Sequence, residues 1–207
     1  MGVDGDLLKQ YTMATWGYKQ GESVSLMIHL GVRLGLYEAL DGAGPVTAGD
    51  LAAATGLHER WLHEWLRSQA AAELMVSDEG ETFELQDEAA MVLARKGTPT
   101  YAGGVFSHLR NPKVADGLAE AFQTGLGLTY DGQGEGSEQH VEAMLAPMAR
   151  ALLVPRVIPA LDGVADRLVA GAKVVDVGCG TGLALELMAA AWPDCTFEGY
   201  DVSERAV

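Results

Sequence analysis

The stretch from Lys173 to Gly182 constrains the fold of this chain more than any other. A short β-branched run leads into glycines at alternate positions, Gly178, Gly180 and Gly182, and a leucine-rich segment follows. This order predicts a buried strand, a tight turn and a helix within about twenty residues. Glycine has no Cβ, so such a turn can adopt positive φ and let a ligand touch the backbone beside the free N–H groups of the helix start.

The residues after the glycines exclude two common phosphate-binding turns. A P-loop ends in Gly-Lys-Ser/Thr, whereas Gly182 is followed by Leu183 and Ala184. A dinucleotide-binding turn has Gly or Ala three residues after its second glycine, and Leu183 or Leu185 occupies that position here, depending on which glycine is counted. Neither phosphate-binding turn fits this sequence.

The run Asp176-Val-Gly-Cys-Gly-Thr-Gly182 resembles motif I of class I S-adenosylmethionine-dependent methyltransferases. The second half of that signature follows at the expected distance, because Thr196–Tyr200 is typical of the next strand and Asp201 ends it. An acid at this position suits a ribose, since one carboxylate can accept hydrogen bonds from both hydroxyls.

This resemblance implies a cofactor, S-adenosyl-L-methionine, and a set of residues that contact it. Asp201 would hold the ribose, Asp176 would lie near the methionine amino group, and the glycine backbone would pack against the cofactor. The implied cofactor-binding residues are Asp176, Gly178, Cys179, Gly180, Gly182, Asp201 and Val202. Cys179 could also be a nucleophile, but we expect a small side chain that packs behind the turn. The sequence identifies no catalytic base and no metal ligands.

The composition limits the kinds of partner that the chain can bind. Acidic residues outnumber Lys and Arg by 29 to 14, for a formal net charge of −15, which opposes binding to nucleic acid or to an anionic membrane. Cys179 and Cys195, the two cysteines, offer no disulfide framework. We find neither a signal peptide nor an apolar run of membrane-spanning length, so we expect a cytoplasmic protein.

The first hundred residues predict a mainly helical domain that is similar to a winged helix. Residues 1–20 could be an arm or a short helix, and an apolar helix is expected over 22–40, where His29 could face a substrate cavity or be an ordinary histidine. Helices over 48–54, capped by Thr47 and Asp50, and over 58–72 follow. The second of these should bury Trp61, Leu62, Trp65 and Leu66, and strands over 74–76 and 82–85 should form a hairpin.

Winged helices often bind DNA, which makes a DNA-binding regulator the rival hypothesis. Here the expected wing is acidic, with Asp78, Glu79, Glu81 and Glu84, so its charge favours a protein-interaction module instead. Small-molecule O-methyltransferases that the chain resembles use such a module to dimerise and to enclose the substrate. We therefore expect a small-molecule methyl acceptor and a homodimer through the apolar helix over 22–40, with burial of that helix inside its own subunit as the alternative.

Residues 99–170 are expected to be helical with interruptions and, by the resemblance, to form the roof of the substrate site. Helices are predicted over 101–109, 113–123 and 138–153, with a glycine-rich loop over 125–136. Tyr130, His108 and His140 are conceivable substrate contacts, although each could equally be a packing or surface residue.

The expected architecture is a winged-helix-like dimerisation domain followed by the start of a Rossmann-like, doubly wound α/β domain. We divide the chain into an arm (1–20), the winged-helix-like domain (21–98), a helical linker (99–170) and a partial cofactor domain (171–207). By the resemblance, a complete sheet of this kind would have about seven strands, and this domain supplies two of them. We therefore expect a fragment of a methyltransferase that is inactive by itself. A cofactor-binding regulator without turnover remains an alternative.

Overall fold

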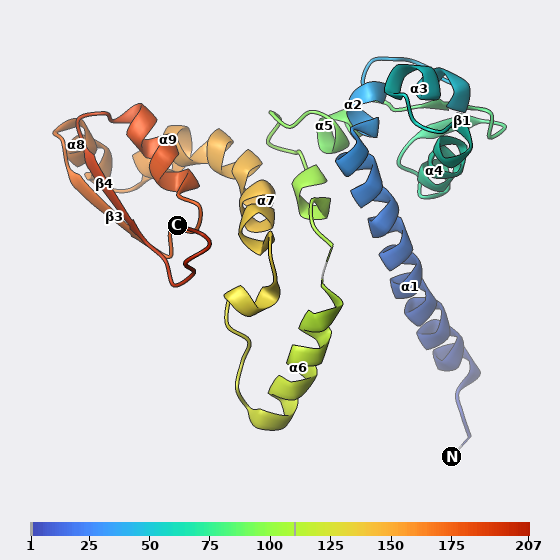
Figure 1. Cartoon of the computed structure of the whole chain (residues 1–207), viewed down its shortest axis with the longest axis horizontal. Coiled ribbons are helices and arrows are strands. Elements are labelled where there is room, and N and C mark those ends of the chain that lie inside the picture. Colours follow the sequence, from blue (N-terminus) through green and yellow to red (C-terminus); the bar gives the residue numbers. More distant parts are fainter. Residues whose placement is uncertain (1, 110) are drawn as a thin grey trace. The chain divides into compact units, whose positions relative to one another are not determined.

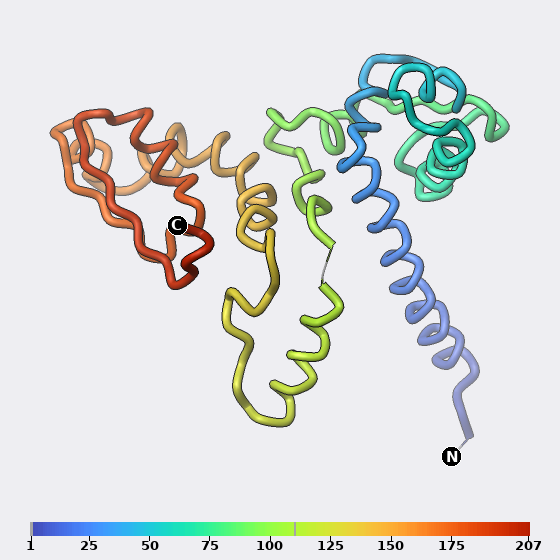
Figure 2. Tube along the Cα trace, in the orientation of Figure 1, coloured from blue at the N-terminus to red at the C-terminus, as the bar shows by residue number. Residues whose placement is uncertain are grey.

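The computed structural model describes residues 2–109 and 111–207, and it divides the chain into two compact units, 1–95 and 96–207 (Figure 1). The division falls close to the end of the expected winged-helix-like domain, and Met1 of the expected arm lies outside the described residues. The path of each unit can be followed in Figure 2. Each unit is described separately below.

The first unit has the helix, helix and hairpin order that the sequence predicts for a winged helix. Its elements are α1 (Gly5–Leu34), α2 (Leu36–Leu40), α3 (Ala48–Thr55), α4 (Glu59–Ala71), β1 (Val76–Asp78), β2 (Thr82–Glu84) and α5 (Asp87–Leu93). β1 and β2 pair antiparallel, and a bridge between Val46 and Phe83 adds to this wing. Thr47 and Asp50 form the predicted capping box at the start of α3. The winged-helix prediction is confirmed.

Helix α1 differs from the prediction at both ends. It begins at Gly5, where the Asp4 side chain accepts hydrogen bonds from the Asp6 and Leu7 amides, and it ends at Gly35 in the left-handed conformation with φ 69°. The segment predicted as an arm or a short helix is therefore part of one 30-residue helix. The apolar segment 22–40 is two helices rather than one, because Gly35 breaks it.

The core of the first unit forms where α1, α2 and α4 meet. Tyr37 of α2 is fully buried, lies edge-on to Trp65 of α4 at 5.2 Å between ring centroids, and donates a hydrogen bond to Gln69 Oε1. Gly31 of α1 permits this packing, since an added Cβ would lie 2.5 Å from the Tyr37 ring and 2.6 Å from the Trp65 ring. Trp61 borders an apolar pocket together with Leu62 and Trp65 but is itself 70% exposed.

The second unit carries the strands that the glycine motif predicts. Its elements are the short turn of helix η1 (Gly103–Phe106), α6 (Pro112–Thr124), η2 (Asp131–Gln133), α7 (Ser137–Leu152), the helical turns η3 (Leu153–Val157) and η4 (Ile158–Ala160), α8 (Val164–Val169), β3 (Lys173–Val177), α9 (Leu183–Ala191) and β4 (Thr196–Tyr200). β3 and β4 are parallel and α9 connects them, which confirms the βαβ start of a Rossmann-like domain. The helix predicted over 101–109 is wrong, because only the turn η1 forms there, and α8 was not predicted.

One face of the two-stranded sheet packs on helices and the other is open. Val174 and Phe197 pack against a cluster formed by Ile158, Leu168 and Met188. On the opposite face, three apolar side chains are exposed, Val175, Val177 and Tyr200. The helices of the second unit therefore cover the sheet from one side, and they leave the glycine turn accessible at the carboxyl end of β3.

Candidate cofactor site and adjoining cavity

The glycine turn at the end of β3 has the conformation that its sequence predicts. Gly178, Gly180 and Gly182 have φ values of 86°, 54° and 84°, a region that residues with a Cβ rarely adopt. A Cβ added at any of the three would meet no atom within 4 Å. Space is therefore open directly above the backbone of the turn, where a ligand could approach it.

Hydrogen bonds attach this turn to the end of β4. The amides of Gly178 and Cys179 donate to the Tyr200 carbonyl at 2.6 and 3.1 Å. Beyond that carbonyl, Asp201 accepts hydrogen bonds from the Ser203 amide on Oδ1 (2.9 Å) and the Gly180 amide on Oδ2 (2.8 Å). These backbone donors, that of Ser203 first, hold the pKa of Asp201 below its usual range. A negative charge therefore lies at the glycine turn at neutral pH.

The other predicted cofactor residues lie around the same turn. Asp176 is half-buried on β3 and is paired with Gly199 of β4 in the parallel ladder. Cys179 packs behind the turn as expected, because a Cβ on Gly199 would lie only 2.7 Å from its Sγ. Val202 is 90% exposed, immediately after Asp201. The structure thus brings the seven predicted residues together at one end of the two strands.

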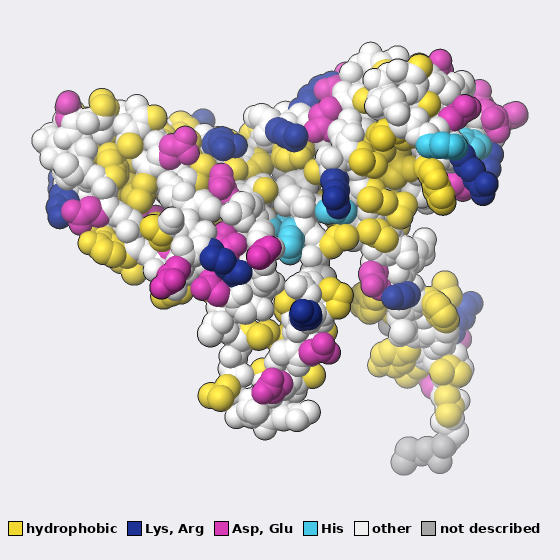
Figure 3. Space-filling model, in the orientation of Figure 1, with side chains coloured by type: hydrophobic (Ala, Val, Ile, Leu, Met, Phe, Trp, Pro, Cys, Tyr) yellow, Lys and Arg dark blue, Asp and Glu magenta, His cyan; other side chains and the backbone are white. Residues whose placement is uncertain are grey.

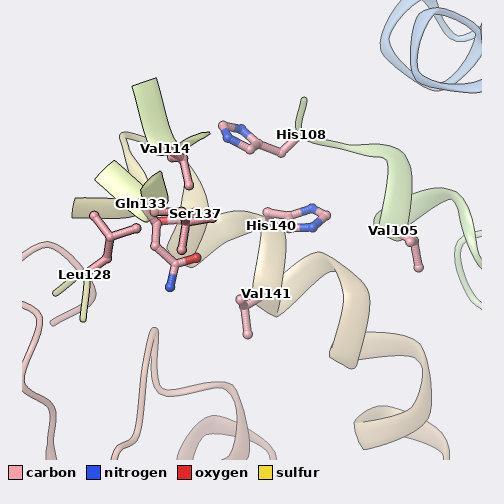
Figure 4. Close-up of a pocket in the computed structure, with 9 residues that line it drawn as sticks. Val105, His108, Val114, Leu128, Gln133, Ser137, His140 and Val141 are labelled. Atoms are coloured by element: carbon pink, nitrogen blue, oxygen red, sulfur yellow. The ribbon is translucent and has the colours of Figure 1, made fainter. Parts of the chain in front are cut away.

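A separate cavity of about 640 Å³ lies in the same unit, between η1, α6 and α7 (Figure 4). Five aliphatic side chains and four polar ones line it: Val105, Val114, Leu118, Leu128, Val141, His108, Gln133, Ser137 and His140. In Figure 4, His140 and Val141 project from α7, with Val105 on one side and Leu128 and Gln133 on the other. The lining suits a mainly apolar molecule that carries a few hydrogen-bonding groups.

Close packing of η1 on α7 positions His140. A Cβ on Gly104 would lie 2.0 Å from the Ala143 carbonyl oxygen, so only glycine allows the contact. Ser107 Oγ lies 3.1 Å from His140 Nδ1 and itself donates its proton to the Gly104 carbonyl at 2.8 Å. The Gly104 backbone also hydrogen-bonds to the ring, and a neutral imidazole has one nitrogen that donates a hydrogen bond and one that accepts.

The surroundings of His140 favour its neutral form. Burial lowers the pKa of His140, and His108, with its ring centroid 5.8 Å away, lowers it further. Of the other histidine and tyrosine candidates, Tyr130 lies on the loop before η2, and burial and the charges of Glu138 and Asp201 raise its pKa. His29 is buried inside the first unit, only 7% exposed. Two of the three conceivable substrate contacts, His108 and His140, thus line one cavity.

Gln133 and Ser137 line the cavity although they were not predicted as site residues. No motif marks them, and they reach the cavity only because the glycine-rich loop folds back between α6 and α7. Gly117 allows part of this approach, since a Cβ there would lie 2.7 Å from the Leu128 side chain. The glycine content of the loop was the one available signal.

The helix that would enter a DNA groove, α4, uses basic side chains inside its own unit. His63 Nε2 lies 3.2 Å from the Gly80 carbonyl oxygen, and Arg67 donates to the same oxygen and pairs with Glu81. These contacts hold the tip of the wing against α4. They also direct Arg67 towards the wing carboxylates, an arrangement that favours a structural role.

Among the described residues, no helix combines the length and hydrophobicity needed to cross a membrane. Within the same residues, no group of three or more His, Cys, Asp or Glu side chains is placed to hold a metal ion.

Comparison with known families and structures agrees with both units. Residues 22–95 match the model of the Rv2258c-like winged HTH domain. No curated protein matches the sequence. Solved structures match almost the whole chain, and those most similar are methyltransferases.

Three of these structures illustrate the likeness. Mitomycin 7-O-methyltransferase MmcR has 22% identity and a TM-score of 0.66 over 98% of this chain. Human N-acetylserotonin methyltransferase in complex with SAM has 19% identity and a TM-score of 0.61 over 99%. CalO1, a methyltransferase of calicheamicin biosynthesis bound to SAH, has 22% identity and a TM-score of 0.55 over 100%. This chain shares their fold. It spans 61%, 62% and 62% of their respective lengths.

Proposed function

We propose that this chain belongs to an S-adenosylmethionine-dependent methyltransferase that acts on a small molecule. The observation that carries the proposal is the open glycine turn at the end of β3, with the Asp201 carboxylate held beside it by a hydrogen bond from the Gly180 amide. The shared fold with methyltransferases supports it.

The residues at the turn fit this cofactor. The space above Gly178, Gly180 and Gly182 would admit a ligand against the backbone. Asp201 Oδ1 accepts from the Ser203 amide and Oδ2 from the Gly180 amide, so the carboxylate that would accept hydrogen bonds from the ribose hydroxyls is already held at the turn. Asp176 supplies a carboxylate for the amino group of the methionine part. When bound, the cofactor supplies an electrophilic methyl group.

The acceptor would occupy the cavity between η1, α6 and α7. Methyl transfer depends mainly on alignment of the acceptor and exclusion of water, and the aliphatic lining would help to exclude water. His140 lines this cavity and offers its imidazole for a hydrogen bond to a polar group on the molecule. The role of His140 in this proposal is to orient the acceptor.

The cofactor assignment is tested by calorimetry on a homologous protein that contains the full doubly wound domain. Replacing the residue that corresponds to Asp201 by Ala should weaken S-adenosylmethionine binding by at least about tenfold, because two hydrogen bonds to a charged group are lost. Unchanged affinity would rule out the assignment of Asp201 to the ribose.

We further propose that the 207 residues alone bind the cofactor weakly and do not turn it over. Only β3 and β4 contribute to the sheet among the described residues, and its open face exposes Val175, Val177 and Tyr200. S-adenosylmethionine should therefore shift the melting temperature little, and an assay with labelled cofactor should show no methylated product. A shift that corresponds to several kcal/mol of binding would require cofactor far above its dissociation constant and would contradict this proposal.

The first unit would serve as the dimerisation module. Inside the segment 22–40, Ile28, Leu36 and Tyr37 are buried in their own unit. The rest of α1 leaves apolar surface uncovered by this unit, with exposed side chains that include Leu7, Leu8, Tyr11, Met13, Trp16 and Tyr18. Hydrophobic side chains are visible along this helix in Figure 3. Light scattering should return the mass of a dimer at micromolar concentration, and a monomer mass would count against the module.

DNA binding is the weaker candidate. The wing carries Asp78, Glu79, Glu81 and Glu84, and these carboxylates would approach phosphate even though Arg67 pairs with Glu81. A mobility-shift assay at low salt should show no complex with duplex DNA. A retained complex that weakens steeply with salt would support the regulator instead.

A further inference from the structure

The loop between α6 and α7 is hydrogen-bonded to the segment that follows β4. Ser203 Oγ donates to Asp131 Oδ1 at 2.5 Å, although the two residues are 72 positions apart. Arg205 Nη2 donates to the Asp131 carbonyl at 2.7 Å and lies 3.5 Å from Asp131 Oδ1. One residue of the loop therefore holds two residues beyond β4.

Ser203 connects this contact to the candidate cofactor site. It is 1% exposed, so its hydroxyl depends on Asp131 for a hydrogen-bond partner. Its amide donates to Asp201 Oδ1, and Asp201 Oδ2 accepts from Gly180. The result is a continuous chain of hydrogen bonds from Asp131 through Ser203 and Asp201 to the glycine turn.

Arg205 attaches the start of α7 to the same segment. Its Nη2 lies 3.3 Å from Glu138 Oε1, an ion pair in which the Glu138 side chain is only 2% exposed. No hydrogen bond from the described residues reaches that oxygen, so the nearby cation is what offsets the charge of this buried carboxylate. The guanidinium thus contacts both Asp131 and the first turn of α7.

The loop held in this way is also a wall of the cavity. Leu128 and Gln133, on either side of Asp131, line it, and so does Ser137 at the start of α7. The cavity wall and the acid proposed for the ribose are consequently parts of one hydrogen-bonded network.

We propose that Asp131 is a positioning residue for Asp201, acting through the buried Ser203. Asp131 fixes the Ser203 hydroxyl and therefore the direction of the Ser203 amide, which orients the Asp201 carboxylate at the glycine turn. The importance of this orientation for a ribose rests on the proposed function. The orientation itself does not, because it is a property of the chain without any ligand.

Hydrogen exchange measured by NMR on the 207-residue chain tests the orientation directly. Asp131→Ala removes the acceptor of Ser203 Oγ but keeps the carbonyl that binds Arg205. Exchange of the Gly180 amide, two steps along the network, should become at least about tenfold faster. Ser203→Ala should have the same effect. Exchange of the Gly180 amide should be no faster in the double variant than in either single variant, because both substitutions remove the same link.

Two further variants separate positioning from general loss of structure. Asp131→Asn keeps an oxygen that can accept from Ser203, so Gly180 exchange should stay close to that of the unsubstituted chain. Asp162→Ala, at an exposed turn residue of the same unit, should leave it unchanged. Faster exchange of the Ser203 amide alone, with Gly180 unaffected in both Asp131→Ala and Ser203→Ala, would overturn the proposal.

A titration of the same variants with S-adenosylmethionine, followed by the shift of the Gly180 amide, tests the functional consequence. The dissociation constant should rise several-fold in Asp131→Ala and stay near that of the unsubstituted chain in Asp131→Asn. Equal affinity in all variants would overturn the role of Asp131 in binding. Absence of binding in the unsubstituted chain would instead count against the proposed function, while the exchange result would still decide the orientation.

Discussion

Asp201 Oδ2 accepts a hydrogen bond from the Gly180 amide at 2.8 Å, which ties the residue after β4 to the turn after β3. The two residues are 21 positions apart, and this bond, together with the Ser203 amide on the other oxygen, sets the direction of the carboxylate. A side chain held in this way loses little additional freedom when it binds a ligand. The candidate cofactor site is therefore largely organised before binding.

This contact predicts a pH dependence of stability. The hydrogen bonds hold the pKa of Asp201 below its unfolded value of about 3.9. The unfolded chain therefore binds the proton first as pH falls, so the stabilisation is complete above about pH 4 and is lost as pH falls through the folded pKa. Unfolding in urea should show that Asp201→Asn destabilises the chain at pH 7 and that the difference shrinks towards pH 3. An equal difference at both pH values would show that the ionised carboxylate is not responsible.

Replacing glycine by alanine at two positions of α1 should change stability in opposite directions. Gly31→Ala should destabilise the chain by about 1 to 3 kcal/mol, because its Cβ would overlap the Tyr37 and Trp65 rings. Gly17→Ala, at an exposed position of the same helix with no atom near the added Cβ, should stabilise it by about 0.5 to 1 kcal/mol. Thermal or urea unfolding measures both. Similar effects at the two sites would contradict the packing of α1 on α2 and α4.

The buried hydrogen bond between Tyr37 and Gln69 predicts a second cost to stability. Tyr37→Phe removes the hydroxyl and leaves Gln69 Oε1 buried without its partner. The free energy of unfolding should fall by about 1 to 3 kcal/mol. Tyr18→Phe, at a side chain that is 81% exposed, is the matched control and should have almost no effect. The free energies of unfolding of the two variants should differ clearly. An unchanged free energy of unfolding in Tyr37→Phe would argue against this hydrogen bond.

The cavity predicts an unusual titration for His140. Burial and the neighbouring His108 lower its pKa below the usual value of about 6.5. The unfolded chain takes up the proton first, so stability is lost as pH falls from about 6.5 through the folded pKa of His140. NMR titration should place the midpoint of His140 below that of an exposed histidine, and His108→Gln should raise it. A midpoint at or above 6.5 would be inconsistent with a neutral ring.

The parts of the structure predicted best from the sequence are those that use local signals. The strand from Lys173 to Val177 alternates in burial and leads into glycines with positive φ, so pattern and turn chemistry agree. The capping box of Thr47 and Asp50 is similarly local. Helix α1 was harder to predict, because most of residues 5–22 are exposed and show no period of buried positions.

Contacts between distant segments could not be predicted. The Ser203 hydroxyl donates to Asp131, 72 residues away, and the Ser203 carbonyl accepts a turn hydrogen bond from Ala206. The bond between Ser107 and His140 spans 33 residues. Neither pair leaves a spacing pattern in the sequence, because each depends on how η1 and the glycine-rich loop pack on α7.

Titration of the ¹⁵N-labelled chain with S-adenosylmethionine into the millimolar range is the most direct test of the central claim. The amides of Gly178, Gly180 and Gly182 should shift in a saturable way, and these shifts should be lost in Asp201→Ala. Both results are expected because the open turn and the Asp201 carboxylate that is hydrogen-bonded to it form one binding surface. If the turn amides do not move at millimolar cofactor, or if they saturate equally in Asp201→Ala, the assignment of this turn and acid to the cofactor is wrong.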